Sequence, residues 1–116
     1  MNIHLAGRFL LIHHSVPSIK NKKIVIRQYD SPKDIGPCHI LFIPQENSYP
    51  LSEILAKVPD KGTLIISEKP GCAALGTGIN FFLADNKVKF EANPKAISGA
   101  GLTASSQLLK LAIIVK

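Results

Sequence analysis

Short apolar runs alternate with one amphipathic segment through the middle of the chain. The runs at residues 23–29, 39–43 and 63–67 are β-branched or continuously apolar, which is typical of strands buried in a sheet. Behind Pro50, four apolar residues recur with helical spacing: Leu51, Ile54, Leu55 and Val58. Strand, helix and strand over residues 39–67 predict a βαβ unit, in which the two strands are parallel and the crossover is right-handed.

An antiparallel hairpin is predicted at residues 79–91. Two strand-like runs flank Asp85 and Asn86, residue types that tolerate the positive φ of a two-residue turn. Such a turn sets Phe81 opposite Phe90 and Leu83 opposite Val88. One face of the hairpin is then apolar, with Ile79, Phe81, Leu83, Val88 and Phe90. The other face is polar apart from Phe82, and it carries Asn80, Lys87, Lys89 and Glu91.

The C-terminal quarter predicts two short helices. Asn93 and Pro94 suit the N-cap and first position of a helix that ends at Gly99 and Gly101. Thr103 or Ser105 can cap a last helix, which carries Leu108, Leu109 and Ala112 toward the core. Residues 112–116 either continue that helix or form an edge strand. The whole pattern predicts an α/β domain with three layers, in which parallel βαβ strands precede the hairpin and the two helices.

The N-terminal residues are compatible with two structures. The run at residues 7–16 is apolar like a strand, but four residues also share one side of a helix: Leu5, Phe9, Ile12 and Val16. Only a few residues separate this segment from the strand at 23–29, and a parallel pair needs a crossover of a dozen or more. A helix is therefore favoured. If the N-terminal segment is a helix, the parallel sheet lacks one strand and has an uncovered edge. Such an edge predicts a dimer or an exchanged N-terminal segment that covers it.

Composition and charge narrow the classes of function. The 116 residues, 46% hydrophobic and 19% charged, suit a single globular domain over residues 1–116. The net charge of +6 is scattered except at Lys20–Lys23, which is interpreted as a solvated turn, so nucleic-acid binding is not expected. No run approaches the roughly 18 apolar residues of a membrane span. The N-terminal run is short and interrupted by histidines, unlike a signal peptide.

The glycine-rich stretch at residues 69–82 does not match a nucleotide-binding motif. Gly71 and Gly76 are spaced as in a P-loop, but Thr77 and Gly78 occupy the positions of the required Lys and Ser/Thr. The dinucleotide motif also fails, because Phe81 stands where its third glycine should be. Glycines at this spacing without the other motif residues are typical of turns.

The sequence contains no recognisable catalytic or metal-binding set. Cys38 and His39 are adjacent, so in an extended segment they point to opposite sides. The histidines and cysteines lack the spacing of zinc ligands, and the carboxylates show no pairing. We therefore expect no catalytic residue, metal or cofactor. Cys38 and Cys72 lie at opposite ends of two predicted parallel strands, roughly 16 Å apart, which is too far for a disulfide.

Open α/β sheets bind ligands beyond the carboxyl ends of their parallel strands. Those ends correspond here to residues 44–48 and 67–71, both of which are polar and turn-rich. Together with the glycine stretch and the start of the hairpin, they give these candidate binding residues: Gln45, Glu46, Ser67, Glu68, Lys69, Gly76, Gly78 and Asn80. A small-ligand or nucleotide-binding domain is therefore one possible function.

Ordered motifs point to a second function. From about residue 20 to residue 112, "GPCHILFIP", "GINF", "VKFEANP", "AGL" and "SSQLLKLA" follow one another at characteristic spacing. In this order they resemble the YfiR family of bacterial periplasmic regulators. By this resemblance, Cys38 matches the family's cysteine before the strand at residues 39–43. The family's hairpin motif is matched by Gly78, Asn80, Phe90, Glu91 and Asn93. Cys38, Phe81, Phe90, Glu91 and Asn93 are taken as the structural signature.

The resemblance implies a non-enzymatic domain that binds and represses a membrane-anchored diguanylate cyclase through its periplasmic portion, with release tied to an outer-membrane lipoprotein. It also implies homodimers, redox-sensitive cysteines and a periplasmic location, or a cytoplasmic one if Met1 is the true start. The family usually carries a helix and a strand before the segment that corresponds to residues 18–30. Residues 1–20 are therefore expected to be an atypical or truncated N-terminal segment.

Overall fold

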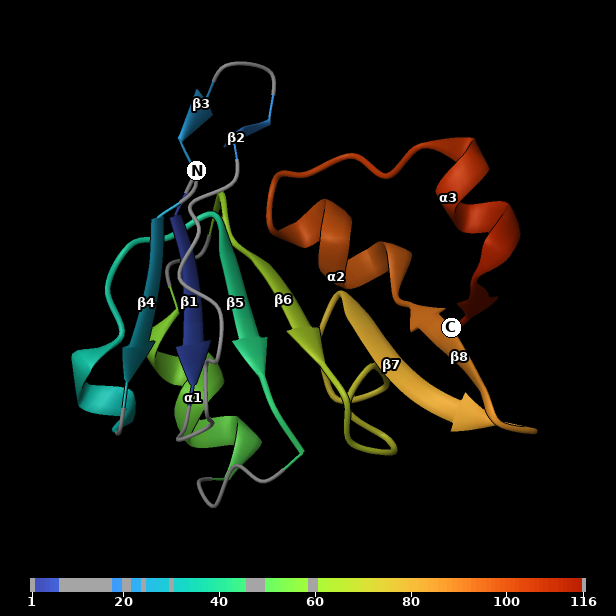
Figure 1. Cartoon of the computed structure of the whole chain (residues 1–116), viewed down its shortest axis with the longest axis horizontal. Coiled ribbons are helices and arrows are strands. Elements are labelled where there is room, and N and C mark those ends of the chain that lie inside the picture. Colours follow the sequence, from blue (N-terminus) through green and yellow to red (C-terminus); the bar gives the residue numbers. More distant parts are fainter. Residues whose placement is uncertain are drawn as a thin grey trace.

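One mixed β-sheet organises the molecule (Figure 1). The computed structural model describes residues 2–6, 18–19, 22–23, 25–29, 31–45, 50–58 and 61–115. Within them, the sheet has the strand order β4-β1-β5-β6-β7-β8-β9. Its strands are β1 (Asn2–Ala6), β4 (Val25–Tyr29), β5 (Ile40–Ile43), β6 (Leu64–Ser67), β7 (Ile79–Ala84), β8 (Lys87–Ala92) and β9 (Ile113–Ile114). All neighbouring pairs are parallel except β7 and β8.

The predicted βαβ unit is confirmed at β5, α1 (Leu51–Lys57) and β6. Ile54 of α1 is fully buried and packs with Leu41 and Ile43 of β5. Leu51 and Val58 contribute to the same core at either end of the helix. The core therefore forms on the face of β5 that holds alternate residues 41 and 43, as the period of two in a strand requires.

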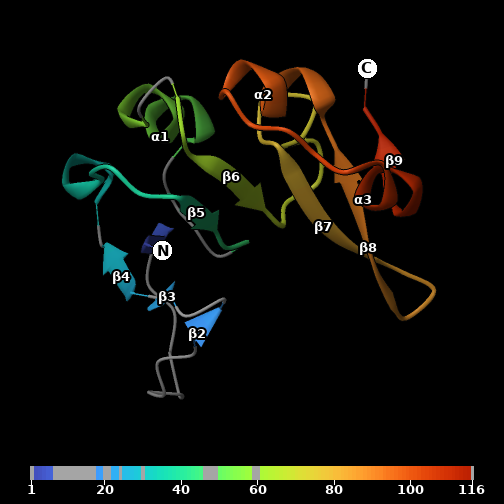
Figure 2. The ribbon, with the colours of Figure 1, turned by 90° about the horizontal axis from the view of Figure 1, so that it is seen from above.

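The short C-terminal helices begin as the sequence predicts. Asn93 caps α2 (Pro94–Gly99) by accepting a hydrogen bond from the Ala96 N–H at 3.0 Å, and Ser105 caps α3 (Ser106–Leu111) through the Leu108 N–H at 3.1 Å. Ser105 rather than Thr103 is therefore the second cap. The chain then forms the edge strand β9 instead of extending α3. Figure 2 shows α1 beside β5 and β6, and α3 beside β8 and β9.

The hairpin is confirmed in every predicted detail of its register. Asp85 and Asn86 adopt φ values of 53° and 62°, so both central residues of the turn are left-handed. Phe81 pairs with Phe90 and Leu83 with Val88. The rings of Phe81 and Phe90 lie 6.0 Å apart and are tilted by 56°. A two-residue turn leaves no alternative register, which explains why the sequence sufficed here.

The preference for an N-terminal helix is wrong for the part that the structure describes. Residues Asn2–Ala6 form β1, which lies between β4 and β5 and is parallel to both. The expected missing strand is therefore present, so the argument from an unpaired sheet edge loses its basis, both for the dimer and for the exchanged segment. Pairing on two sides satisfies the backbone of β1, a tertiary effect that an apolar pattern cannot reveal. The rest of the ambiguous segment lies outside the described residues.

The predicted strand at residues 23–29 begins later than expected. β4 starts at Val25, whereas Lys22 and Lys23 form β3 (Lys22–Lys23), which pairs antiparallel with β2 (Ser18–Ile19). Part of the lysine cluster is thus in a small strand pair rather than in a turn. After β4, the 3₁₀ helix η1 (Pro32–Asp34) follows Ser31, whose side chain accepts from the Lys33 N–H.

Candidate functional site

The ends of the parallel strands β5 and β6 are joined by a side chain. The backbone N–H of Gln45 donates a hydrogen bond of 2.9 Å to Oε1 of Glu68. Both residues border a hollow of about 440 Å³, which is otherwise lined by Pro70, Phe81, Phe82, Leu83 and Val88. Two of the predicted binding residues therefore meet at the carboxyl edge of the sheet. Glu46 lies outside the described residues.

A buried polar network lies directly behind this edge. Asn80 is fully buried, and its Oδ1 accepts hydrogen bonds from Ser67 Oγ at 2.8 Å and from the Lys69 N–H at 3.1 Å. Ser67 Oγ also lies 2.8 Å from Thr77 Oγ1, and Asn80 Nδ2 donates to Glu91 Oε1 at 3.0 Å. In the described part of the chain, every buried side-chain polar atom has a partner. The network therefore connects β6, β7, β8 and the glycine-rich loop.

The glycine-rich loop is built by turns and packs closely. Gly71 and Gly76 have φ values of 85° and 125°, which favour glycine. A Cβ on Gly78 would lie 2.9 Å from Leu64 Cδ1 and 3.2 Å from Ile97 Cγ1. Gly78 thus allows α2 and β6 to approach β7. These positions support the interpretation of the stretch as turn chemistry, whereas a ligand role for Gly76 and Gly78 stays a prediction.

The far half of the hairpin exposes apolar side chains. Leu83 and Val88, which lie opposite each other, are 75% and 69% exposed, while Ile79 at the near end of the same face is buried. The sequence predicts this face to be apolar, but it gives no measure of how far neighbouring elements cover it. The exposed pair borders the hollow at Gln45 and Glu68. Together, these four residues and Phe82 form the candidate interaction surface.

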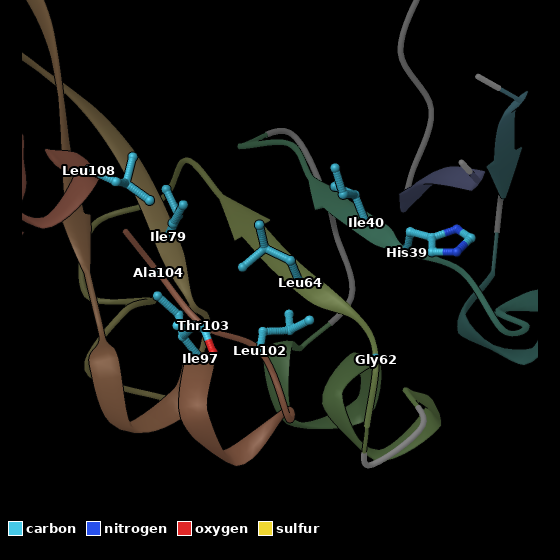
Figure 3. Close-up of a pocket in the computed structure, with 10 residues that line it drawn as sticks. All are labelled: His39, Ile40, Gly62, Leu64, Ile79, Ile97, Leu102, Thr103, Ala104 and Leu108. Atoms are coloured by element: carbon cyan, nitrogen blue, oxygen red, sulfur yellow. The ribbon is translucent and has the colours of Figure 1, made fainter. Parts of the chain in front are cut away.

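A second hollow lies between the sheet and the C-terminal helices (Figure 3). Its volume is about 300 Å³. Ile40, Leu64 and Ile79 come from three neighbouring strands, and they line it together with Ile97 of α2 and Leu108 of α3. Its lining is almost wholly apolar, with His39 and Thr103 at the border. This hollow represents the space left where short helices cover a twisted sheet.

Cys38 and Cys72 are both buried free thiols. Cys38 precedes β5 and Cys72 follows β6, so they lie at opposite ends of a parallel pair, in agreement with the predicted separation. Burial raises the pKa of the Cys38 thiol, and a hydrogen bond with Thr63 partly opposes this rise. Among the described residues, no cluster of three metal-ligating side chains occurs, and no helix could cross a bilayer.

Comparison with known families assigns the chain. A YfiR/HmsC-like family model matches residues 10–113. The chain belongs to the YfiR/HmsC-like family. No curated protein matches it significantly. Membership confirms the resemblance carried by the ordered motifs, and it supports a regulatory domain of periplasmic cyclic-di-GMP signalling.

In this YfiR/HmsC-like chain, the signature residues hold the hairpin in place. Phe81 and Phe90 pack against each other, Glu91 accepts from Asn80, and Asn93 caps α2. Asn93 Nδ2 also donates to the Ala73 carbonyl at 2.7 Å. Cys38 packs in the core beneath α1. Sequence reasoning missed the combination of Leu83 and Val88 with the hollow, because exposure depends on elements distant in the chain.

Proposed function

We propose that this protein is a non-enzymatic regulator that binds the periplasmic portion of a membrane-anchored diguanylate cyclase and represses it. Family membership supports the regulatory role and the periplasmic compartment. The candidate interaction surface supports recognition of a protein. The partner would then control how much cyclic-di-GMP the cell makes, while this chain performs no chemistry of its own.

The exposed pair Leu83 and Val88 carries the proposal. Each side chain would gain about 1.5–3 kcal/mol from full burial against a partner. The pair lies on a hairpin whose base is anchored by the Asn80 network, so the surface is presented without a large ordering cost. The adjacent hollow of about 440 Å³ offers a recess for one partner side chain.

Calorimetry with the purified periplasmic portion of a membrane-anchored diguanylate cyclase from the same organism tests the proposal. We expect saturable binding, and we expect Leu83→Asp and Val88→Asp to weaken it by more than about tenfold, since each loses burial worth over 1.4 kcal/mol. Leu75→Asp is the matched control, because Leu75 is 69% exposed on the glycine-rich loop. Binding that is equal in all three variants, or absent with the wild-type chain, would contradict the proposal.

A homodimer belongs to the same proposal. Leu111, Ile113 and Ile114 are exposed apolar side chains close together in the chain, where α3 passes into β9. A surface of this kind is suited to a second copy of the chain. Analytical ultracentrifugation should detect a dimer that Leu111→Asp dissociates, and a monomer at all concentrations would refute this part.

The hollow at Gln45 and Glu68 also supports the binding of a small ligand as a second candidate function. Gln45 and Glu68 give it a polar border, and the predicted residues Ser67, Lys69 and Asn80 lie close behind in the network. The Glu68 carboxylate disfavours phosphate groups, so uncharged or cationic ligands fit better than nucleotides. Calorimetry with nucleotides and cyclic dinucleotides should therefore give no saturable signal, whereas a clear signal with an uncharged or cationic ligand would favour this candidate over the first.

A further inference from the structure

The outer edge of β8 is only partly paired. β8 pairs with β7 along its whole length, but β9 reaches only Glu91 and Ala92. Within the described residues, no strand pairs with positions 87–89 on the outer side. Figure 2 shows the tip of the hairpin extending beyond α3 and β9. An edge of this kind is a template for another extended chain.

The turn determines which backbone groups point outward. In a two-residue hairpin, Ala84 and Lys87 exchange hydrogen bonds across the ladder, so alternate residues of β8 direct their N–H and C=O groups inward. Val88, Phe90 and Ala92 direct theirs outward. The bond of 2.9 Å from the Val115 N–H to the Ala92 carbonyl agrees with this alternation. Val88 therefore presents one donor and one acceptor at the unpaired edge.

The two faces of this edge have different chemistry. Val88 and its neighbour Leu83 are exposed on one face. On the other face, Lys87 and Lys89 are exposed and their cross-strand partners are uncharged. The nearest acidic residues along the chain are Asp85, in the turn itself, and Glu91, which accepts a hydrogen bond from Asn80. The edge therefore offers apolar contact on one face and positive charge on the other.

We infer that this edge of β8 accepts an extended segment of a partner protein in which acidic and apolar residues alternate. A strand added beside Val88 would place side chains opposite Lys87 and Lys89 on one face and beside Val88 on the other. Acidic residues complement the lysines, and apolar residues cover the valine. This inference rests on the proposed function and names the chemistry of the segment that the partner contributes.

A second copy of the chain fits this edge poorly. Two β8 edges paired antiparallel would set Lys87 and Lys89 of one copy against those of the other, and like charges directly opposite are destabilising. A bilayer also fits poorly, because insertion of the tip would leave the outward groups of Val88 without hydrogen-bond partners in hydrocarbon. A heterologous acidic strand satisfies both the charges and the backbone.

The first experiment uses two six-residue peptides with blocked ends, one alternating glutamate with valine and one alternating lysine with valine. With the full chain, the glutamate peptide should shift the backbone amide signals of Val88 and Phe90. It should bind at least about tenfold more tightly than the lysine peptide, since two cross-strand charge pairs together reach that scale. Added salt should reduce the difference. Equal affinities, or shifts confined to other elements, would overturn the inference.

Charge reversal makes the test specific. Lys87→Glu combined with Lys89→Glu should reverse the preference, so that the lysine peptide binds more tightly. Lys57→Glu is the matched control, because Lys57 is exposed at the end of α1, and it should leave the preference unchanged. Reversal by the control variant, or none by the double variant, would contradict edge pairing.

The backbone component is tested by methylation. Two isomers of the glutamate peptide, N-methylated on alternate residues, block one edge of the peptide or the other, so one isomer should bind and the other should not. Equal binding of both would exclude a strand pairing. Association with anionic phosphatidylglycerol vesicles that depends on Leu83, or self-association through β8, would also count against the inference.

Failure of the inference is separable from failure of the proposed function. One outcome is that the cyclase portion binds and Leu83→Asp weakens this binding, while charge reversal at Lys87 and Lys89 has no effect on it. The proposed function is then retained, and the inference of strand pairing at β8 is rejected. If the glutamate peptide binds as expected but no cyclase portion does, the edge is a docking site and the proposed partner is wrong.

Discussion

Asn93 donates a hydrogen bond of 2.7 Å to the carbonyl oxygen of Ala73, twenty positions earlier in the chain. The same side chain caps α2 through the Ala96 N–H. Ala73 is fully buried in the glycine-rich loop, so its carbonyl has no access to bulk water. One side chain thus fixes the end of the hairpin, the start of a helix and the loop beneath them.

Replacing Asn93 should therefore lower the free energy of unfolding by more than the loss of a helix cap alone. Asn93→Ala removes the cap, worth about 1 kcal/mol, and one of the two hydrogen bonds of the Ala73 carbonyl, worth about 0.5–1.5 kcal/mol. The carbonyl keeps its bond of 3.2 Å from the Gly76 N–H. Asn93→Ser is the matched control, since serine retains the cap but cannot reach Ala73. Urea unfolding should give the highest free energy of unfolding for the wild type, a lower one for the serine variant and the lowest for the alanine variant. A serine variant as stable as the wild type would remove the role of the bond to Ala73, and equal values for serine and alanine would remove the role of the cap.

Gly78 should tolerate no side chain. In Gly78→Ala the new methyl group would meet Leu64 and Ile97 at distances shorter than normal contact, so we expect a loss of about 1–3 kcal/mol. Gly99→Ala is the control, because Gly99 lies in α2 with open space around its Cβ position. Thermal unfolding should show a lower midpoint for the first variant only. An unchanged midpoint would mean that the neighbouring side chains move apart freely.

The sequence predicts the parts of this fold whose register is local. Asp85 and Asn86 define the hairpin, Pro50 and the stripe from Leu51 define α1, and Asn93 defines the start of α2. It could not predict β1, because Asn2–Ala6 is ordered as a strand by pairing with β4 and β5, which are distant in sequence. Local propensity is a weak guide where tertiary pairing decides.

The candidate site likewise has one part that the sequence predicts and one part that it does not. Topology alone brings Gln45 and Glu68 together, since strands β5 and β6 are parallel and their ends meet. The burial of Asn80 is not predictable from the hairpin pattern, which places it on a polar and therefore solvent-facing side. The glycine-rich loop covers that side and supplies Thr77 to the network. A loop that returns over a sheet face cannot be recognised from hydrophobic periodicity.

Substitution of Asn80 should lower the stability of the fold more than substitution of most other polar residues. Asn80→Ala removes the acceptor of Ser67 and Lys69 and the donor to Glu91, so we expect a loss of about 2–3 kcal/mol from the unpaired groups. Glu91→Gln is the milder control, because a glutamine oxygen can still accept from Asn80. Guanidinium unfolding of both variants checks this. A loss of the same size in both would indicate that the Glu91 charge, not the network, is the stabilising element.

The stability of the protein should fall at alkaline pH, in part through Cys38. Burial raises the pKa of this thiol in the folded chain above its value in the unfolded chain, although the hydrogen bond with Thr63 acts against the rise. The unfolded chain therefore releases the proton first as pH increases. The contribution of the protonated thiol is complete below the unfolded pKa of about 8.5, and it is lost as pH rises through the folded pKa.

Comparing the wild type with Cys38→Ala isolates this contribution. The substitution leaves a small cavity at every pH, so it lowers the free energy of unfolding by a constant amount, and the pH-dependent part of the difference belongs to the thiol. We expect the gap between wild type and variant to be widest near neutral pH and to narrow as the pH rises above about 8.5. Urea unfolding across this range measures the gap, and a gap that stays constant would show that Cys38 ionises alike in both states.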